Sequence, residues 1–188
     1  TVATVTEIYD YMRVLYARAG IPYSPFTGKA ITSQTITQIV DLIKKLPKKS
    51  TIYIYAPVVR GRKGEYKKDI LGYKRRGFRK IKIDNVLYDI EKSPNLDKKL
   101  KHDISVLVDR IVLSSKLGNR LAEGIETAVN LSNGLVFIEY EDETLPQKFR
   151  KVEKLIYSTK FACPESGFTI EEIEPRLFSF NSPFGACE

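Results

Sequence analysis

The stretch Thr51-Ile-Tyr-Ile-Tyr-Ala-Pro-Val-Val59 is rich in β-branched and aromatic residues, a composition that favours a β-strand. Before it, Thr35-Ile-Thr-Gln38 has the spacing of a capping box, in which a Thr hydroxyl and a Gln side chain satisfy exposed N–H groups at a helix start. Apolar residues then recur at helical spacing until Pro47, at Ile36, Ile39, Val40 and Ile43. The sequence therefore predicts a helix followed by a strand.

The residues after this strand predict a loop, a helix and a hairpin. Residues 60–64 (RGRKG) are typical of a loop, and residues 65–76 of a charged helix that Gly77 closes. Residues 79–90 read as a hairpin that turns at Asp84-Asn85, because both residues tolerate positive φ.

The remaining segments alternate between the two kinds of element. We expect a loop at residues 95–101, a strand at 104–113, a helix over 117–129 that ends at Asn133-Gly134, a strand at 135–141 and a polar linker at 142–151. A further helix is expected near the N-terminus, opened by a capping box at Thr4 and Glu7 and stopped by Gly20 and Pro22. Since there is no clean βαβ rhythm, the pattern indicates an α+β fold with a small mixed sheet and helices packed on it.

Charge is distributed unevenly along the 188 residues, which carry a net charge of +8. Residues 44–102 hold 19 Lys and Arg against six Asp and Glu, whereas residues 121–188 hold six basic against 12 acidic side chains. A basic field of this kind attracts phosphate backbones or an acidic protein surface. It is equally consistent with a solvated lysine-rich face.

Composition excludes several classes of protein. No apolar run is long enough for a membrane span, there is no secretory leader, and two cysteines cannot form a disulfide scaffold, so a cytoplasmic protein is expected. The only methionine is Met12 and the chain stops at Phe-Gly-Ala-Cys-Glu188, which suggests a piece of a larger protein.

The sequence contains no complete active site. It has no nucleotide-binding loop, and its only histidine, His102, sits among lysines and is expected to be a surface residue. A basic-groove nuclease would need clustered acidic metal ligands, but the acidic residues gather after residue 121. We therefore expect no enzymatic activity from this chain.

Cys163-Pro-Glu-Ser166-Gly167 has the shape of a zinc knuckle with Ser in place of the second Cys. Cys187 would open a second knuckle at the end of the chain. A neutral serine is a poor zinc ligand beside thiolates, so this half-site is incomplete. The alternative is two unrelated buried thiols.

Five stretches resemble the UvrA family, the damage-sensing ATPase subunits of the bacterial excinuclease. They are residues 1–18 (TVATVTEIYDYMRVLYAR), 56–66 (APVVRGRKGEY), 98–103 (KKLKHD), 108–110 (VDR) and 174–187 (EPRLFSFNSPFGAC). The resemblance covers the whole chain in order.

The resemblance implies a role in nucleotide excision repair of DNA damage, within the SOS response. Residues 23–152 would form the UvrB-binding domain, inserted between the flanking segments 1–22 and 153–188 of the first signature domain. The parent would hydrolyse ATP, work as a homodimer on damaged double-stranded DNA and hold ATP as cofactor, with zinc as a second candidate. The Walker motifs would lie outside this chain.

The sequence departs from the family pattern at Ser166 and at Tyr23-Ser-Pro-Phe-Thr-Gly28, where many relatives carry cysteine. Too few thiolates remain to close a zinc tetrahedron. We therefore expect no stoichiometric zinc.

Two mechanisms are open for the charged surface. In the first, charges of both signs dock UvrB, and the candidate residues are Lys80, Lys82, Asp109, Arg110 and Arg120. In the second, the basic face of residues 44–102 tracks DNA phosphates, and the candidates are Arg60, Arg62, Lys63, Lys67, Lys68, Lys74, Arg75 and Arg76. Interleaved tyrosines would stack on bases or, more commonly, complete a core.

Overall fold

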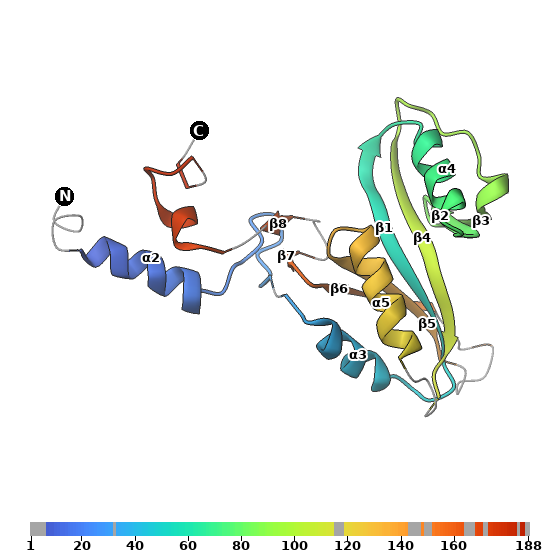
Figure 1. The fold of residues 1–188 in the computed structure, drawn as a ribbon, viewed down its shortest axis with the longest axis horizontal. Coiled ribbons are helices and arrows are strands. Elements are labelled where there is room, and N and C mark those ends of the chain that lie inside the picture. The colour runs from blue at the N-terminus through green and yellow to red at the C-terminus, as the bar shows by residue number, and fades with distance from the viewer. Residues whose placement is uncertain are drawn as a thin grey trace. The chain divides into compact units, whose positions relative to one another are not determined.

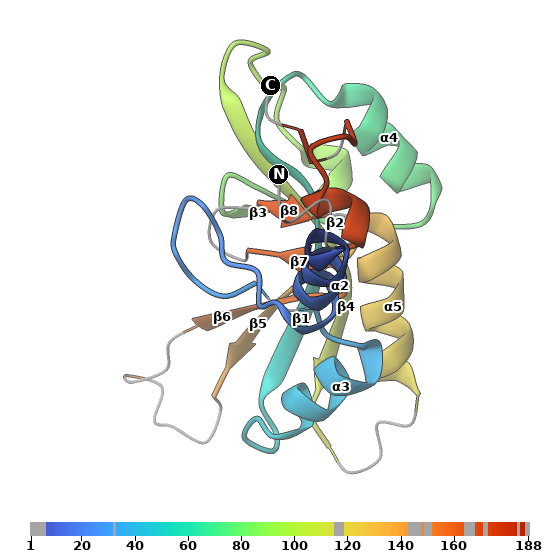
Figure 2. The same ribbon diagram turned by 90° about the vertical axis from the view of Figure 1, so that its left-hand side faces the viewer.

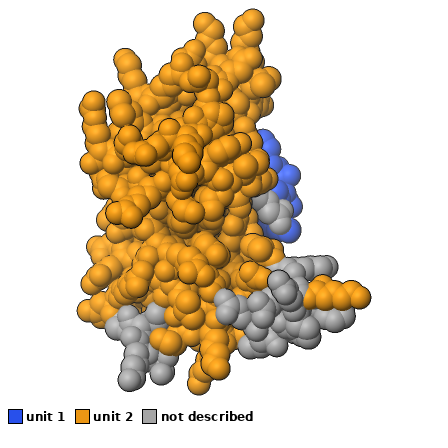
Figure 3. Space-filling view, turned by 90° about the vertical axis from the view of Figure 1, so that its right-hand side faces the viewer, with its two compact units in different colours: residues 1–33, 160–188 blue, residues 34–159 orange. Residues whose placement is uncertain are grey.

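The computed structural model describes residues 7–31, 33–114, 119–142, 148, 152–163, 168–170, 173–183 and 185–186. The chain divides into two compact units, which Figure 3 distinguishes by colour. Unit 1 comprises Thr1–Ser33 with Lys160–Glu188, and unit 2 comprises Gln34–Thr159. Within the described residues, no helix is long and apolar enough to cross a membrane.

Unit 2 is built on a six-stranded sheet in the order β3-β2-β4-β1-β5-β6. Its elements are α3 (Ile36–Lys44), β1 (Thr51–Lys63), α4 (Lys67–Arg75), β2 (Lys80–Ile83), β3 (Val86–Asp89), the 3₁₀ helix η1 (Ile90–Lys92), β4 (Lys101–Val112), α5 (Arg120–Leu131), β5 (Leu135–Glu141) and β6 (Val152–Ser158). The α+β class predicted from the sequence is confirmed. Each of the five pairings between these strands is antiparallel, in place of the mixed sheet that we expected.

The long antiparallel pair of β1 and β4 forms the centre of the sheet. β1 continues to Lys63 and so includes residues 60–63, which we expected in a loop. The pairing register of β1 and β4 shifts after Ile54, Pro57 and Val59. These shifts let the strand continue past Pro57 and past Gly61, which is left-handed with φ of +56°. The Gly61 N–H donates to Asp103 Oδ1 at 2.7 Å, so a β4 carboxylate satisfies an amide at the irregularity.

The helices lie on one face of the sheet, as Figures 1 and 2 show for α3 and α5. A first core joins α3 and α5 to β1, β4 and β5, and includes Ile39, Ile43, Ile52, Ile54, Ile125 and Ile138. A second core lies between α4 and the hairpin end of the sheet, and includes Ile70, Ile81, Ile83, Ile104 and Val106. Val58 packs against both cores. The opposite face carries Tyr53, Tyr55 and Phe137, and none of the helices that the structure describes in unit 2 lies on it.

Local sequence signals account for most element boundaries in unit 2. The expected capping box at Thr35 and Gln38 is present, with both reciprocal hydrogen bonds formed. The hairpin turns at Asp84 and Asn85 with φ of +48° and +68°, and Gly77 follows α4 with φ of +92°. β6 had no counterpart in the sequence prediction, and it pairs with β5 along its whole length.

Unit 1 contains α2 (Ile8–Ala19), β7 (Phe161–Ala162), β8 (Thr169–Ile170) and the 3₁₀ helix η3 (Pro175–Phe178). The expected N-terminal helix is confirmed, but Glu7 is its N-cap, while Thr4 of the expected capping box lies outside the described residues. The Tyr9 ring stacks on Phe180 at 4.7 Å between centroids. α2 buries none of its residues.

His102 is 5% exposed, which corrects the expectation of a surface residue. Its Nδ1 lies 2.8 Å from Asp84 Oδ2 and its Nε2 lies 3.0 Å from the Asp97 carbonyl oxygen. Both partners are hydrogen-bond acceptors, so both nitrogens donate only when the imidazole is protonated. The bond to Asp84, followed by the bond to Asp97, raises the pKa of His102. The side chain thereby ties the hairpin turn to the start of β4.

We expect the stability of the protein to fall as pH rises through the pKa of His102. The folded pKa lies above the unfolded value of about 6.5, so the stabilisation is complete below that pH and is lost above the folded pKa. His102→Gln should be less stable at about pH 6 and should show no such decline between about pH 6 and pH 9. Urea unfolding midpoints measure this. A decline that persists in the variant would contradict the assignment.

α5 approaches the sheet closely at Gly124, where an added Cβ would lie 2.9 Å from Ile54 Cδ1. We expect Gly124→Ala to lower the free energy of unfolding by about 1 kcal/mol, because the overlap outweighs the gain in helix propensity. In Gly124→Ala/Ile54→Val the overlapping Cδ1 is absent, so the combined loss should be smaller than the sum of the single losses.

Gly72 in α4 is the matched control, because a Cβ there has no atom within 4 Å. Gly72→Ala should raise stability by about 0.5–1 kcal/mol. If the losses in free energy of unfolding from Gly124→Ala and Ile54→Val were additive, the contact between position 124 and Ile54 Cδ1 would not limit helix packing.

Candidate interaction surface

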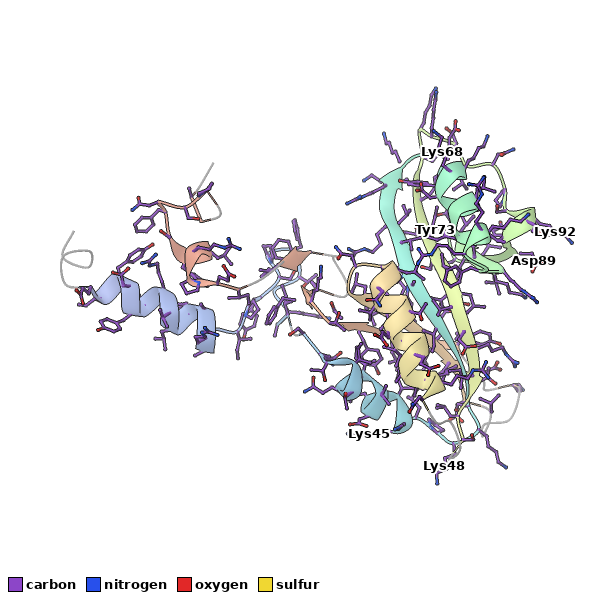
Figure 4. All side chains as sticks on the ribbon, viewed as in Figure 1. Lys45, Lys48, Lys68, Tyr73, Asp89 and Lys92 are labelled. Carbon is purple, nitrogen blue, oxygen red and sulfur yellow. The ribbon has the colours of Figure 1, made fainter. Side chains whose placement is uncertain are left out.

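The five candidates for protein docking occupy three elements of unit 2. Lys80 and Lys82 lie on β2, Asp109 and Arg110 on β4, and Arg120 is the first residue of α5. The structure brings Asp109, Arg110 and Arg120 into direct contact. Lys80 is exposed and pairs in the sheet with Asp89 of β3. Figure 4 labels Asp89.

Lys82 is engaged within the sheet rather than extended into solvent. Its Nζ lies 2.5 Å from Glu139 Oε1 on β5, and the two side chains are 20% and 12% exposed. β4 and β1 lie between β2 and β5, so the lysine reaches across two strands. Its ammonium lies 5.4 Å from the centroid of the Tyr55 ring beneath it. Lys82 therefore covers Tyr55 on the helix-free face.

Two further cations cover aromatic rings on neighbouring strands. Arg110 Cζ lies 5.7 Å from the Tyr53 ring centroid, and Lys154 Nζ on β6 lies 3.9 Å from that of Phe137 on β5. Each cation is held near its ring by charge–quadrupole attraction. The helix-free face therefore presents cations over an aromatic layer.

Burial and neighbouring charges shift the pKa values of two groups on this face. Burial, followed by the charge of Glu139, raises the pKa of Tyr55. Burial also lowers the pKa of Lys154, against the attraction of Glu139. Glu139 is the carboxylate that these groups share. Sequence reasoning missed it, although Phe137, Glu139 and Glu141 alternate with core residues along β5 and so share one face.

The Asp109 carboxylate and the Arg120 guanidinium form a two-point ion pair. Arg120 Nε donates to Asp109 Oδ2 and Arg120 Nη2 donates to Asp109 Oδ1, each at 2.8 Å. Arg120 first, and the Arg110 N–H to a smaller extent, lower the pKa of Asp109 against the effect of burial. Arg120 lies one helical turn before Gly124, so the close approach at Gly124 places it over β4.

The eight candidates for DNA contact lie at the other end of the β1–β4 pair. Arg60, Arg62 and Lys63 end β1, and the other five belong to α4 or its C-cap. All eight are exposed. Lys74 pairs with Glu91 at 3.0 Å, and Lys67 lies 4.0 Å from Glu65. Burial, and then repulsion from Arg62, lower the pKa of Arg60, so like charges crowd there.

The tyrosines near these cations do not form one stacking platform. Tyr66 and Tyr73 pack against the second core, under α4. Tyr53 and Tyr55 lie on the helix-free face, beneath Arg110 and Lys82. They are therefore divided between the two faces of the sheet.

Of the residues in the degenerate zinc module, Ser166 and Cys187 lie outside the described residues. Cys163 is buried, and its Sγ lies 3.3 Å from Thr27 Oγ1. In the part of the chain that the structure describes, no three His, Cys, Asp or Glu side chains are grouped so that they could hold a metal ion.

Comparison with known proteins identifies relatives along the whole chain. A protein-family model described as the UvrA interaction domain matches residues 34–142. The UvrABC system protein A of Mesorhizobium japonicum is 54% identical over 198 residues, that of Rickettsia typhi 51% over 189, and that of Bradyrhizobium diazoefficiens 52% over 199. Each match covers 100% of this chain and 20% of the relative. The chain therefore spans about a fifth of the length of these relatives, and it belongs to the UvrA family, whose interaction domain it carries.

Proposed function

We propose that unit 2 docks UvrB, so that the parent protein loads UvrB at damaged DNA during nucleotide excision repair. The observation that carries the proposal is the group formed by Asp109, Arg110 and Arg120, which offers charges of both signs at the surface of unit 2. The match to an interaction domain supports a binding role. In this proposal the parent, a cytoplasmic homodimer of the SOS response, hydrolyses ATP, and this segment is not itself an enzyme.

The chemistry of the surface suits a reversible contact. Complementary charges speed the encounter of two proteins and fix their register, whereas exposed ion pairs add little lasting affinity. A subunit that delivers its partner and then leaves needs this combination. Lys82 contributes indirectly in this scheme, because it is held by Glu139.

A second candidate function is direct binding of the DNA backbone. The eight exposed cations at the end of β1 and on α4 favour it, since crowded like charges gain from a phosphate neighbour. Lys68, at the opposite end of unit 2 from Lys48 in Figure 4, belongs to this group. The two functions use different parts of unit 2 and are separable by mutation.

We expect Lys80→Glu to slow association with UvrB by about three- to tenfold, because a charge at the rim of an interface acts mainly on the encounter rate. Lys68→Glu should leave UvrB association unchanged and reduce the salt dependence of DNA binding by about one unit of log–log slope. Surface plasmon resonance at two salt concentrations measures both partners.

Asp109 and Arg120 need a paired design, because reversing either alone leaves two like charges in contact. The swap Asp109→Arg/Arg120→Asp keeps the ion pair and reverses its polarity. It should weaken UvrB binding while circular dichroism shows an intact fold. Unchanged affinity in both the swap and Lys80→Glu would disprove this surface. Weaker UvrB binding in Lys68→Glu alone would move docking to α4.

We also propose that the chain binds no stoichiometric zinc. In support, Cys163 is 1% exposed and contacts the Thr27 hydroxyl, and Ser166 replaces the second thiol of its knuckle. Elemental analysis of the purified chain after dialysis should find well below one zinc per chain. One tightly held zinc per chain would contradict the proposal.

A further inference from the structure

In the part of the chain that the structure describes, the outer edge of β4 has no neighbouring strand beyond Val106. β2 pairs with β4 only over Ile104–Val106, whereas β1 pairs with β4 on the other side as far as Val112. Among the described residues, residues 107–112 therefore form an edge on the side where β2 would continue. Six residues is the length of an ordinary strand.

The main-chain groups of this edge alternate in direction. The Leu113 N–H donates to the Ser50 carbonyl, and the Leu113 carbonyl accepts from Lys49, so Leu113 faces the β1 side. Neighbouring residues in an antiparallel ladder alternate between facing the partner and facing away. The main-chain N–H and C=O groups of Arg110 and Val112 consequently point away from β1, and those of Ile111 point toward β1.

The Asp109–Arg120 ion pair covers the outward groups at the middle of this edge. The Arg110 N–H donates to Asp109 Oδ1 at 2.8 Å, and the Arg110 carbonyl accepts from Arg120 Nη2 at 3.4 Å. Side chains thus occupy the donor and acceptor that an added strand would use. Proteins commonly protect free edges with charged side chains, because an uncovered edge pairs with other chains.

The Arg120 side of this cover is accessible to solvent. The Arg120 and Asp109 side chains are 62% and 24% exposed, so a partner carboxylate can reach the Arg120 guanidinium from solvent. Val112 is 49% exposed, and the three cations Lys80, Arg110 and Arg120 on β2, β4 and α5 outnumber Asp109 and Asp89, the carboxylate opposite Lys80. The local charge therefore favours an acidic partner.

We propose that residues 107–112 of β4 accept an extended, acidic segment of the docking partner as an additional strand. The Asp109–Arg120 pair closes this edge in the free protein and moves aside on docking. The Arg110 N–H and carbonyl then bond to the main chain of the partner, and Arg120 pairs with a partner carboxylate. The inference rests on the proposed docking function, and it adds the form of the contact.

Hydrogen exchange of the chain, free and bound to UvrB, tests the proposal by amide-resolved NMR. Strand addition should slow exchange of the Arg110 and Val112 amides by about tenfold or more, because both would gain main-chain acceptors. The Ile111 amide, already facing β1, should change little. Val86–Asp89 in β3, the outermost strand at one edge of the sheet, is the matched control and should not change.

The outcomes separate the two proposals. Binding of UvrB without slower exchange at Arg110 and Val112 would overturn strand addition and leave docking intact. Absence of UvrB binding would overturn the docking function itself. Equal slowing of Arg110, Ile111 and Val112 would indicate general burial by side-chain contacts, and it would also overturn strand addition.

A variant tests the cover in the free protein. Asp109→Ala/Arg120→Ala should speed exchange of the Arg110 amide by about tenfold, since the acceptor Asp109 Oδ1 is removed. Glu91→Gln, which weakens an exposed ion pair away from this edge, should leave that amide unchanged. An Arg110 amide that exchanges equally slowly in the double variant would show that the ion pair does not cover the edge.

Discussion

The packing of α5 against the β1–β4 pair at Gly124 links the first core to the charged group on the surface of unit 2. A glycine at this position lets the helix backbone approach Ile54, and the first core closes around that contact. Arg120, one turn earlier on the same helix, is thereby carried to Asp109 on β4. The same helix therefore contributes both to the packing of the interior and to the arrangement of charges at the surface.

The hairpin end of the sheet depends on polar contacts to a greater degree. Asp84 bonds to the Asp103 N–H and to His102, and Asp103 in turn accepts from the Gly61 N–H. These bonds connect the hairpin turn, β4 and the irregular end of β1. The cations proposed to contact DNA at the end of β1 therefore lie on a segment whose conformation is held by the carboxylates of Asp84 and Asp103.

Periodicity predicted the elements whose signals are local, such as α3 with its capping box and the hairpin at Asp84 and Asn85. It did not predict that β1 continues to Lys63, because Gly61 and the neighbouring charges are also typical of loops. The ion pairs of Lys82 with Glu139 and of Asp109 with Arg120 join different elements, 57 and 11 positions apart, so strand order and helix approach decide them. His102 was misjudged for the same reason, since its partners come from two other segments.

The two cores of unit 2 lie at different ends of one long strand pair, and Val58 contacts both. Such an arrangement lowers the cooperativity of unfolding. The end with α4 and the hairpin can open while the core under α3 and α5 keeps its own contacts. Unit 2 should therefore contain two cooperative folding units that share the β1–β4 strand pair. Opening of the α4 end would then leave the first core and the edge at Asp109 largely intact.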